Sequence, residues 1–384
     1  MNFFYFLYGV IGPHSGVMKK VISQSLALSS LGVNVHLFML GFDDEIYPDY
    51  PFLKIIPISK ESNSSRAGRL KRILLSRRVL FSLIKTLNRE DILYYRRTNS
   101  FPFYYPINYF RLFRKCRLIT EHQSIAYKEI GLSGWSFYSI LEKLFSPFII
   151  NQSDAIIGVT EEITRHEVSC LLNKKKPHYT IGNGIDVKEH IIRDNRGLKK
   201  DCYELICVAQ FNKWHGLDRL INGLKQYRGE VPVSLHLVGD GIEIFDIPEE
   251  PSGGKSLFSI INHGFMTGKE LDSLFNQCHI AVGSLAIHRK GLAMTSELKA
   301  REYCARGIPF IISCEDPDFP DDFPYIFRVT PDESPIDIQS VINFAQKVCS
   351  DPDHPHKMRK YAEWNLDWSM KMQELKRFID IVFN

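Results

Sequence analysis

The sequence predicts an α/β protein with two doubly wound halves, each a parallel sheet covered by helices on both faces. Short apolar strands alternate with helical patterns along the chain, which is typical of parallel sheets. Near the middle, a turn and a polar linker at 177–201 interrupt this alternation, and a second series of the same kind follows. With 384 residues, the chain is long enough for two domains of ordinary size.

The first half opens with an apolar strand, a glycine-rich loop and a helix. The strand is FFYFLY at 3–8, the loop is GVIGPHSG, and the helix spans 17–31 and is ended by Gly32. Further apolar segments end in polar residues and are expected to be strands. They lie at 33–40, 91–97, 116–122, 154–160 and 179–181.

The second half repeats this pattern. Its expected strands lie at 203–210, 233–241, 258–266, 279–285 and 309–315, and its expected helices at 216–227, 268–277 and 296–306. An amphipathic helix at 368–383 follows and is expected to cross back to the first half. We therefore place an N-terminal domain at 1–186, joined by the helix at 366–384, and a C-terminal domain at 187–365. In open parallel sheets ligands bind at the carboxyl ends of the strands, so the loops there are the first candidates for a site.

Composition excludes several classes of protein. No apolar run reaches the ~18–20 residues that a membrane-spanning helix needs. The first residues include no basic region and no small-residue cleavage site, which favours a first strand over a secretory signal. The eight cysteines form no Cys-x-x-Cys pair, so free thiols in a reducing cytosol are expected instead of a disulfide framework or a zinc site.

Positive charge is concentrated in the first half. Residues 1–186 contain 24 Lys and Arg against 15 Asp and Glu, whereas the rest contains 24 against 29. Two segments, at 66–89 and 104–118, interleave cations with apolar and aromatic residues. This pattern indicates either ordinary solvated helices or a surface that lies on an anionic bilayer. No nucleic-acid-binding module is present, so no nucleic acid is expected as a partner.

Two loops that each lead from a strand into a helix could hold an anion. In GPHSGVMKKV at 12–21, Gly12 and Gly16 would let backbone N–H groups approach a phosphate or a sugar. In AQFNKWHGLDRLI at 209–221, Lys213, His215 and Arg219 cluster near a helix N-terminus, where the helix dipole favours an anion. A tight turn in the first loop and helix capping in the second explain the same residues without a ligand.

The most informative segment is SLAIHRKGLAMTSELKAREY at 284–303. Arg289 and Lys290 are expected on its loop, followed by Lys299 and Glu302 on one face of a helix. A lysine in the first turn opposes the helix dipole at a cost of roughly 0.3–1 kcal/mol, and a bound diphosphate would reverse the sign of that effect. The pair formed by residues 297 and 301 has the spacing of a solvated surface ion pair.

Other charged residues carry less information. In TEHQS, Glu121 and His122 end a strand of the first half, where a histidine is either a hydrogen-bonded structural residue or a catalytic one. The acidic segment at 314–324 is expected to be a solvated loop. The segment DPDHPH at 351–356 has the spacing of neither a zinc site nor an EF-hand.

Taken together, the motifs of this chain resemble one family, the retaining glycosyltransferases of group 1 (family four), which have the GT-B fold. The resemblance covers nearly the whole chain and is strongest to a subset that makes bacterial capsular and cell-surface polysaccharides. The motifs are, in order, GPHSG, TEH, IGNGID, VAQFNKWHGLDRLI, LVGDG, HGFMTGKEL and LKAREYCARGIP. The resemblance implies two Rossmann-like domains that face each other across a cleft. The first would hold the acceptor and the second the nucleotide-sugar donor.

The resemblance also implies roles for individual residues. Glu302 matches a glutamate that bonds the donor ribose, and Leu298 and Lys299 match the position where helix amides and a cation meet the diphosphate. His122 matches a histidine near the transferred sugar. The remaining matched positions are Gly264, Phe265 and Met266, which would frame the base, and Gly16, near the diphosphate.

Three positions depart from the family pattern. A first glutamate, eight residues before Glu302, would fall at Met294. An arginine and a lysine that bind the diphosphate would fall at Gln210 and His215. The cation expected to take their place is Lys213, Arg289 or Lys290. No metal ion is expected if Lys299, Arg289 and Lys213 bind the diphosphate.

The expected function is transfer of a sugar from a nucleotide diphosphate to an acceptor hydroxyl with retention at the anomeric carbon. We expect catalytic roles for His122, Lys299 and Arg289, and donor-binding roles for Lys213 and His215 beside the matched residues. The acceptor would be a glycan, lipid-linked in this interpretation, and the basic first domain would hold the protein in the cytoplasm at the inner face of the membrane. Two alternatives remain, namely an epimerase or phosphorylase of the same fold and a non-catalytic sugar-nucleotide-binding protein.

Overall fold

The computed structural model describes residues 1–60, 66–97, 116–173, 175–194, 201–247 and 257–383. Residues 104–115 of the second basic segment lie outside these ranges. The chain forms two compact units, unit 1 from Met1–Gly182 with Trp368–Asn384, and unit 2 from Asn183–Asp367. Among the described residues, no helix is both long and apolar enough to cross a membrane.

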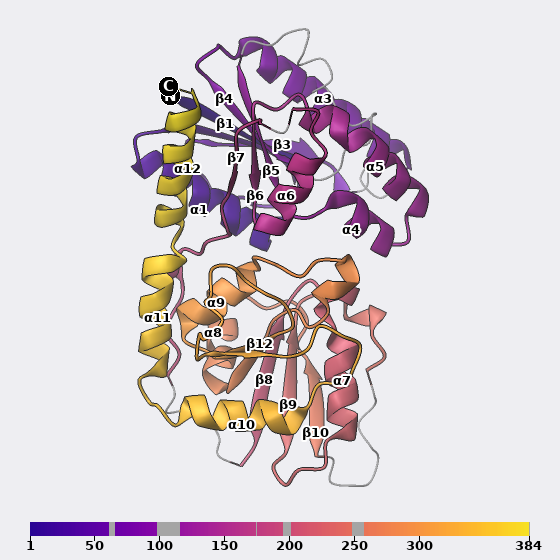
Figure 1. Cartoon of the computed structure of the whole chain (residues 1–384), viewed down its shortest axis with the longest axis vertical. Coiled ribbons are helices and arrows are strands. Elements are labelled where there is room, and N and C mark those ends of the chain that lie inside the picture. Colours follow the sequence, from indigo (N-terminus) through magenta and orange to yellow (C-terminus); the bar gives the residue numbers. More distant parts are fainter. Residues whose placement is uncertain (61–65, 98–115, 174, 195–200, 248–256, 384) are drawn as a thin grey trace. The chain divides into compact units, whose positions relative to one another are not determined.

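Unit 1 contains a seven-stranded parallel sheet with the strand order β3-β2-β1-β4-β5-β6-β7 (Figure 1). The strands are β1 (Asn2–Val10), β2 (Asn34–Phe42), β3 (Leu53–Ile58), β4 (Ile92–Arg97), β5 (Arg117–His122), β6 (Ala155–Gly158) and β7 (His178–Thr180). The sequence interpretation missed β3, a short strand that contains Pro57. A proline is tolerated there because β3 lies at the edge of the sheet.

In the described part of unit 1, six helices accompany this sheet. They are α1 (Gly16–Ser30), α3 (Arg66–Thr86), α4 (Ala126–Leu132), α5 (Ser136–Ile150), α6 (Glu161–Ser169) and α12 (Trp368–Phe383). Leu80 and Ile84 of α3 and Ile149 of α5 belong to one buried cluster with Phe6 of β1, so both helices cover the same face. The neighbouring residue Tyr5 points the other way and donates a hydrogen bond to Gln24 of α1.

The C-terminal helix α12 belongs to unit 1. Its Phe378 stacks on Tyr179 of β7, with 5.4 Å between the ring centroids. At its first residue, the ring of Trp368 lies 5.7 Å from Nζ of Lys20 in α1. These aromatic contacts hold α12 against the first half of the chain, although 185 residues of unit 2 separate them in sequence.

Unit 2 contains a six-stranded parallel sheet with the order β10-β9-β8-β11-β12-β13. The strands are β8 (Tyr203–Val208), β9 (Val233–Val238), β10 (Phe258–Asn262), β11 (Ile280–Val282), β12 (Phe310–Ile312) and β13 (Ile326–Arg328). The helices are α7 (Leu217–Gln226), α8 (Gly268–Gln277), α9 (Leu298–Arg306), α10 (Ile338–Cys349) and α11 (His354–Asn365). Two doubly wound parallel sheets confirm the predicted fold class.

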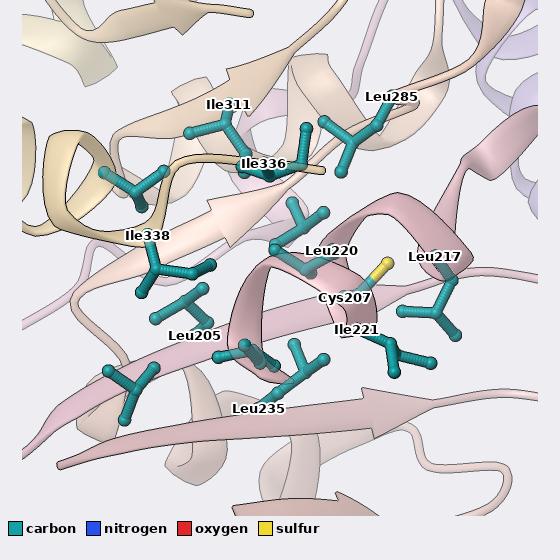
Figure 2. Packing of buried hydrophobic residues seen from close by; sticks show 14 of the residues in the cluster. Leu205, Cys207, Leu217, Leu220, Ile221, Leu235, Leu285, Ile311, Ile336 and Ile338 are labelled. Carbon is teal, nitrogen blue, oxygen red and sulfur yellow. The ribbon is translucent and has the colours of Figure 1, made fainter. Parts of the chain in front are cut away.

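The core of unit 2 lies between its sheet and the helices α7 and α10. Leu220 and Ile221 of α7 meet Leu205 of β8, and Ile338 at the start of α10 closes the cluster (Figure 2). This packing fixes α7, and therefore the loop before it, against the carboxyl ends of β8 and β11. The strand order reverses between these two strands, because β8 pairs with β9 on one side and β11 on the other. Loops at such a reversal are the usual ligand site of an open parallel sheet.

Candidate functional site

The candidate site is built on the two loops at the strand reversal of unit 2. After β8, a short 3₁₀ helix (Lys213–His215) leads into α7, and its carbonyl oxygens are bonded by the loop after β11. Leu285 donates its N–H to the carbonyl oxygen of His215 at 3.0 Å, and Ala286 to that of Trp214 at 3.2 Å. The residue after His215 has to be glycine. The φ of Gly216 is +64°, and a Cβ there would lie 2.9 Å from the Leu285 backbone.

The helix α9 starts beside these loops with no side chain capping its N-terminus. The residue at the cap position, Glu297, turns its carboxylate away to accept the N–H of Ser284 at 3.1 Å. Asn183, from the IGNGID motif, donates its N–H to Oγ of Ser296 at 2.7 Å, which fixes the residue before the cap. An uncapped helix start leaves backbone N–H groups and the positive end of the helix dipole for another acceptor.

Lys299 brings a positive charge into this site. Its Nζ is buried and has no hydrogen-bond partner among the described residues. The nearest carboxylate oxygen, Oε2 of Glu297, lies 4.0 Å away, which is too far for a hydrogen bond. A buried ammonium group without a hydrogen-bond acceptor is costly, so the arrangement favours an anion that would supply acceptors.

His215 is held in its neutral form next to Lys299. Its Nδ1 accepts the N–H of Asn212 at 3.0 Å, so the ring proton of neutral His215 sits on Nε2. Burial lowers the pKa of His215 well below its usual value, and the charges of Lys299 and Lys290 lower it further. Two cations and a neutral N–H donor therefore gather around the start of α9. Lys290 is itself placed by Trp214, with Nζ 4.5 Å from the ring.

Arg289 is placed differently from the expectation that it contacts the diphosphate. Its guanidinium donates to both oxygens of Asp218 at 2.9 and 2.6 Å, to the Lys213 carbonyl at 2.7 Å and to both carboxylate oxygens of Glu333. These hydrogen bonds raise the pKa of Arg289, Glu333 contributing most and Asp218 next. All five N–H donors are used, so in this geometry Arg289 joins the start of α7, the short 3₁₀ helix before it and the loop that carries Glu333. Its catalytic role stays a prediction that this geometry does not favour.

The other predicted donor residues of unit 2 lie at the same edge of the sheet. Glu302 is one turn after Lys299 on α9, where its Oε1 accepts Nε–H of Arg306 at 2.9 Å and lies 3.5 Å from Nδ1 of His190. The side chain of Lys213 is exposed. Leu298 is the first residue of α9. Their predicted contacts to ribose and diphosphate stay predictions.

The loop after β10 carries the residues expected to frame a base. The carbonyl oxygen of Gly264 accepts the N–H of Gly239 at 2.8 Å, which joins the loops after β9 and β10. Phe265 is 56% exposed, and Met266 follows it in the turn before α8. An exposed aromatic ring on a loop held by a backbone hydrogen bond is able to stack on a planar ligand.

The two predicted residues of unit 1 are His122 and Gly16. The ring of His122 is buried, with Nδ1 3.3 Å from both Nη1 of Arg97 and Oε1 of Glu167, and Nε2 3.0 Å from Oγ1 of Thr120. Both ring nitrogens therefore have partners in the core. These contacts favour the structural role for His122, one of the two roles that the sequence left open. Gly16 is the first residue of α1, and Ser15 before it caps the helix by accepting the N–H of Met18.

Two expectations about charged residues are wrong. Arg301 and Glu297 do not form a surface pair, because Arg301 is buried and bonds the carboxylates of Asp316 and Asp318. The acidic segment at 314–324 is therefore partly buried and not simply a solvated loop. For Arg219 the sequence left an anion site and a structural role open, and the structure favours the structural role, because its buried guanidinium donates to Asp332 and to backbone carbonyls, including that of Ser334 at 2.8 Å.

Met294, at the position of the missing first glutamate, forms a single β-bridge with Glu315. The sequence analysis did not name Asn183 or Ser284, which place the start of α9. Asn183 lies in the matched motif IGNGID, but it contacts Ser296, 113 positions away, and no local sequence pattern indicates such a contact. No three His, Cys, Asp or Glu side chains of the described residues form a group that would hold a metal ion. The expectation that no metal is needed stays a prediction.

Comparison with solved structures identifies the architecture. Sucrose-phosphate synthase of Thermosynechococcus elongatus superposes with a TM-score of 0.69 at 13% identity, covering 100% of this chain and 99% of that one. HepE of Anabaena, in complex with UDP and glucose, gives 0.61 at 12% identity and 99% of both chains. The chain has the GT-B fold.

A third structure with the GT-B fold, the apo form of the lipopolysaccharide outer core galactosyltransferase WaaB, gives a TM-score of 0.58 at 14% identity over 99% of both chains. No family model matches the sequence, and no curated protein matches it either. At these identities the likeness establishes the GT-B fold, while the chemistry of this chain has to be argued from its own residues.

Proposed function

We propose that the protein is a glycosyltransferase that takes a sugar from a nucleotide diphosphate donor. The observation that carries this proposal is the buried Nζ of Lys299, without a hydrogen-bond partner among the described residues, beside an uncapped helix start and neutral His215. This is a site for an anion of more than one oxygen, at the strand reversal where open sheets bind nucleotides. HepE, which has the same fold, is solved with UDP-glucose and with UDP.

In the proposed reaction, the bond between the anomeric carbon and the phosphate oxygen breaks, and negative charge grows on the leaving diphosphate. Lys299, the Nε2–H of His215 and the backbone N–H groups at the start of α9 would stabilise that charge. Such preorganised donors are usually the largest single contribution to a reaction of this kind. Lys290 adds a second positive charge near the same point.

The finer assignment rests on the resemblance of the motifs. We propose that transfer occurs with retention, that unit 2 holds the donor and unit 1 the acceptor, and that the acceptor is a lipid-linked glycan of a surface polysaccharide. The protein would work in the cytoplasm, attached to the inner face of the membrane. WaaB, a galactosyltransferase of the lipopolysaccharide outer core, has the same fold and is consistent with such a role.

The first experiment is a binding screen of uridine, guanosine, adenosine and thymidine diphosphates by calorimetry. One of them should bind, and Lys299→Met should weaken that binding about tenfold or more, because a hydrogen bond to a charged group contributes ~1.5–3 kcal/mol. Lys225→Met, which changes an exposed lysine of α7, is the matched control and should bind like the wild type. If no nucleotide binds, or if both variants bind equally well, the proposed site is wrong.

A second experiment separates transfer from the alternatives. The sugar conjugate of the best nucleotide is incubated with a lipid-linked glycan, without any acceptor, and with a glycan plus inorganic phosphate. Glycosylation of the lipid-linked glycan in the first mixture supports the proposal. Conversion of the sugar without an acceptor would identify an epimerase, phosphate-dependent cleavage a phosphorylase, and binding without turnover a sugar-nucleotide-binding protein.

A further inference from the structure

The helix α5 of unit 1 buries two polar side chains together with Ile149 and Ile150, while it exposes several large apolar side chains. Its buried side carries Glu142 and Ser146, which bond Nη2 of Arg97 at 2.6 and 2.7 Å. Most of the side chains that face outward are apolar, and these are 41–68% exposed. They are, with the residue before the helix, Trp135, Phe137, Tyr138, Ile140, Leu144 and Phe148.

This set of six outward side chains, which we call the α5 apolar face, is a continuous surface and not a scatter of single residues. Positions 137, 140, 144 and 148 are three or four residues apart and therefore line up along one side of the helix. Proteins rarely expose so many large apolar side chains together unless a partner or a membrane covers them. The stability of unit 1 does not explain the pattern, because the core contacts of α5 come from its other side.

The charges around the α5 apolar face are positive. The only acidic residue of α5, Glu142, is buried, while Lys143 is exposed beside the apolar stripe. The helix α3 covers the same face of the sheet, contains no acidic residue, and has exposed cations at Arg78 and Lys85. Figure 1 shows α3 and α5 on one side of unit 1, with α4 next to α5. The short helix α4 adds Lys128 and Glu129, whose charges cancel.

We propose that the α5 apolar face docks on an anionic lipid bilayer, with α5 lying in the plane of the headgroups. An amphipathic helix with apolar residues on one side and cations at its flanks binds such surfaces by burial and by attraction to acidic lipids. Trp135 and Tyr138 are the side chains that favour the interface between headgroups and acyl chains. Pairing with a second copy of the chain is disfavoured, because the same cations would meet across the interface.

This docking surface deepens the proposed function and rests on it in one respect. A lipid-linked acceptor is the reason for the protein to bind a membrane. The helix α5 lies outside the two basic segments, 66–89 and 104–118, for which a membrane surface was considered from the sequence. Binding to vesicles needs neither a donor nor an acceptor. A failed sugar-transfer assay and a failed vesicle assay are therefore separate results.

The test is co-sedimentation with vesicles of phosphatidylcholine alone or with about one third phosphatidylglycerol. The full chain should bind the anionic vesicles, and Ile140→Gln with Leu144→Gln should lower the partition coefficient about tenfold or more. The matched control, Ile46→Gln with Leu172→Gln, changes two apolar residues of unit 1 that are even more exposed and should bind like the wild type.

A second measurement does not depend on these substitutions. Brominated acyl chains should quench part of the tryptophan fluorescence of the bound protein, and Trp135→Phe should remove that part. Absence of binding by the wild type, equal binding by the two double variants, or quenching that persists in Trp135→Phe would each overturn the proposal. So would a dimer in solution that the Ile140→Gln and Leu144→Gln pair converts to a monomer.

Discussion

The ammonium group of Lys299 and the carboxylate of Glu297 lie 4.0 Å apart in unit 2, both largely buried, without forming a hydrogen bond. Glu297 instead accepts the N–H of Ser284, so it lowers the positive charge of the site without holding the lysine. An anion that binds at the start of α9 would meet both the attraction of Lys299 and the repulsion of Glu297.

Glu297→Gln is therefore expected to tighten binding of the nucleoside diphosphate found in the screen. Glutamine keeps an acceptor for Ser284 and removes the negative charge, and a gain of roughly threefold is reasonable for one charge near a partly shielded site. Calorimetry at low salt measures the change. Glu270→Gln, on the exposed side of α8, is the control and should leave affinity unchanged. Weaker binding in Glu297→Gln would show that the carboxylate contacts the ligand favourably.

Arg289→Met separates the two roles considered for this arginine. If Arg289 joins the loops through Asp218 and Glu333, its loss should lower the free energy of unfolding by about 1–2 kcal/mol and change nucleotide affinity less than threefold. Urea unfolding and calorimetry give the two numbers. A loss of affinity as large as that of Lys299→Met would restore Arg289 to the diphosphate, as the sequence interpretation had it.

The buried pair of Lys20 and Glu121 is expected to be strongly coupled. Nζ of Lys20 lies 3.0 Å from Oε1 of Glu121, and both side chains are almost fully buried. Lys20→Met should lower the free energy of unfolding by about 3–5 kcal/mol, because it leaves the buried carboxylate without the stronger of its two cationic neighbours, Lys20 and Arg96, and adding Glu121→Gln should recover much of the loss. Urea titrations of the double-mutant cycle measure the coupling, with exposed Lys19→Met as the control. Additive effects would contradict this prediction.

The charge of Glu167 makes unit 1 sensitive to acid. Burial alone would raise the pKa of Glu167, but the charges of His122 and Arg97 bring it down to about 2. A carboxyl whose pKa is lower in the folded state stabilises the fold above its ordinary pKa, and this contribution is lost as pH falls through the folded value. Between about pH 4.5 and pH 2, the free energy of unfolding of the wild type should fall by roughly 3 kcal/mol more than that of Glu167→Gln, because the variant lacks this carboxylate at every pH. Unfolding curves across this range that run parallel for the two proteins would contradict the prediction.

The sequence predicted the fold because its elements carry local signals. The expected helices at 268–277 and 368–383 have the ends that the structure gives to α8 and α12. Strand β3 was missed, since its six residues include a proline that only an edge position tolerates. Helices α10 and α11 were not predicted from the sequence. They lie after the last predicted strand, at 309–315, where the predicted alternation of strands and helices ends.

The candidate site was predicted less well, because its charges are decided by contacts distant in sequence. The spacing of residues 297 and 301 fits a surface pair, yet Arg301 is buried by two aspartates that lie 15 and 17 positions later. The five donors of Arg289 are taken by residues 44, 71 and 76 positions away. Spacing along a helix reports on a shared face, and it carries no information about which loop covers that face.

The assignment of α12 to unit 1 also bears on how the protein is made. The ribosome completes the first 182 residues, then all of unit 2, and only afterwards the helix whose Trp368 and Phe378 contact unit 1. At ~5–20 residues per second, synthesis of unit 2 takes roughly 10–40 s. During that interval the nascent unit 1 presents the surface of α1 that α12 later covers, and chaperones have a defined period in which to bind it.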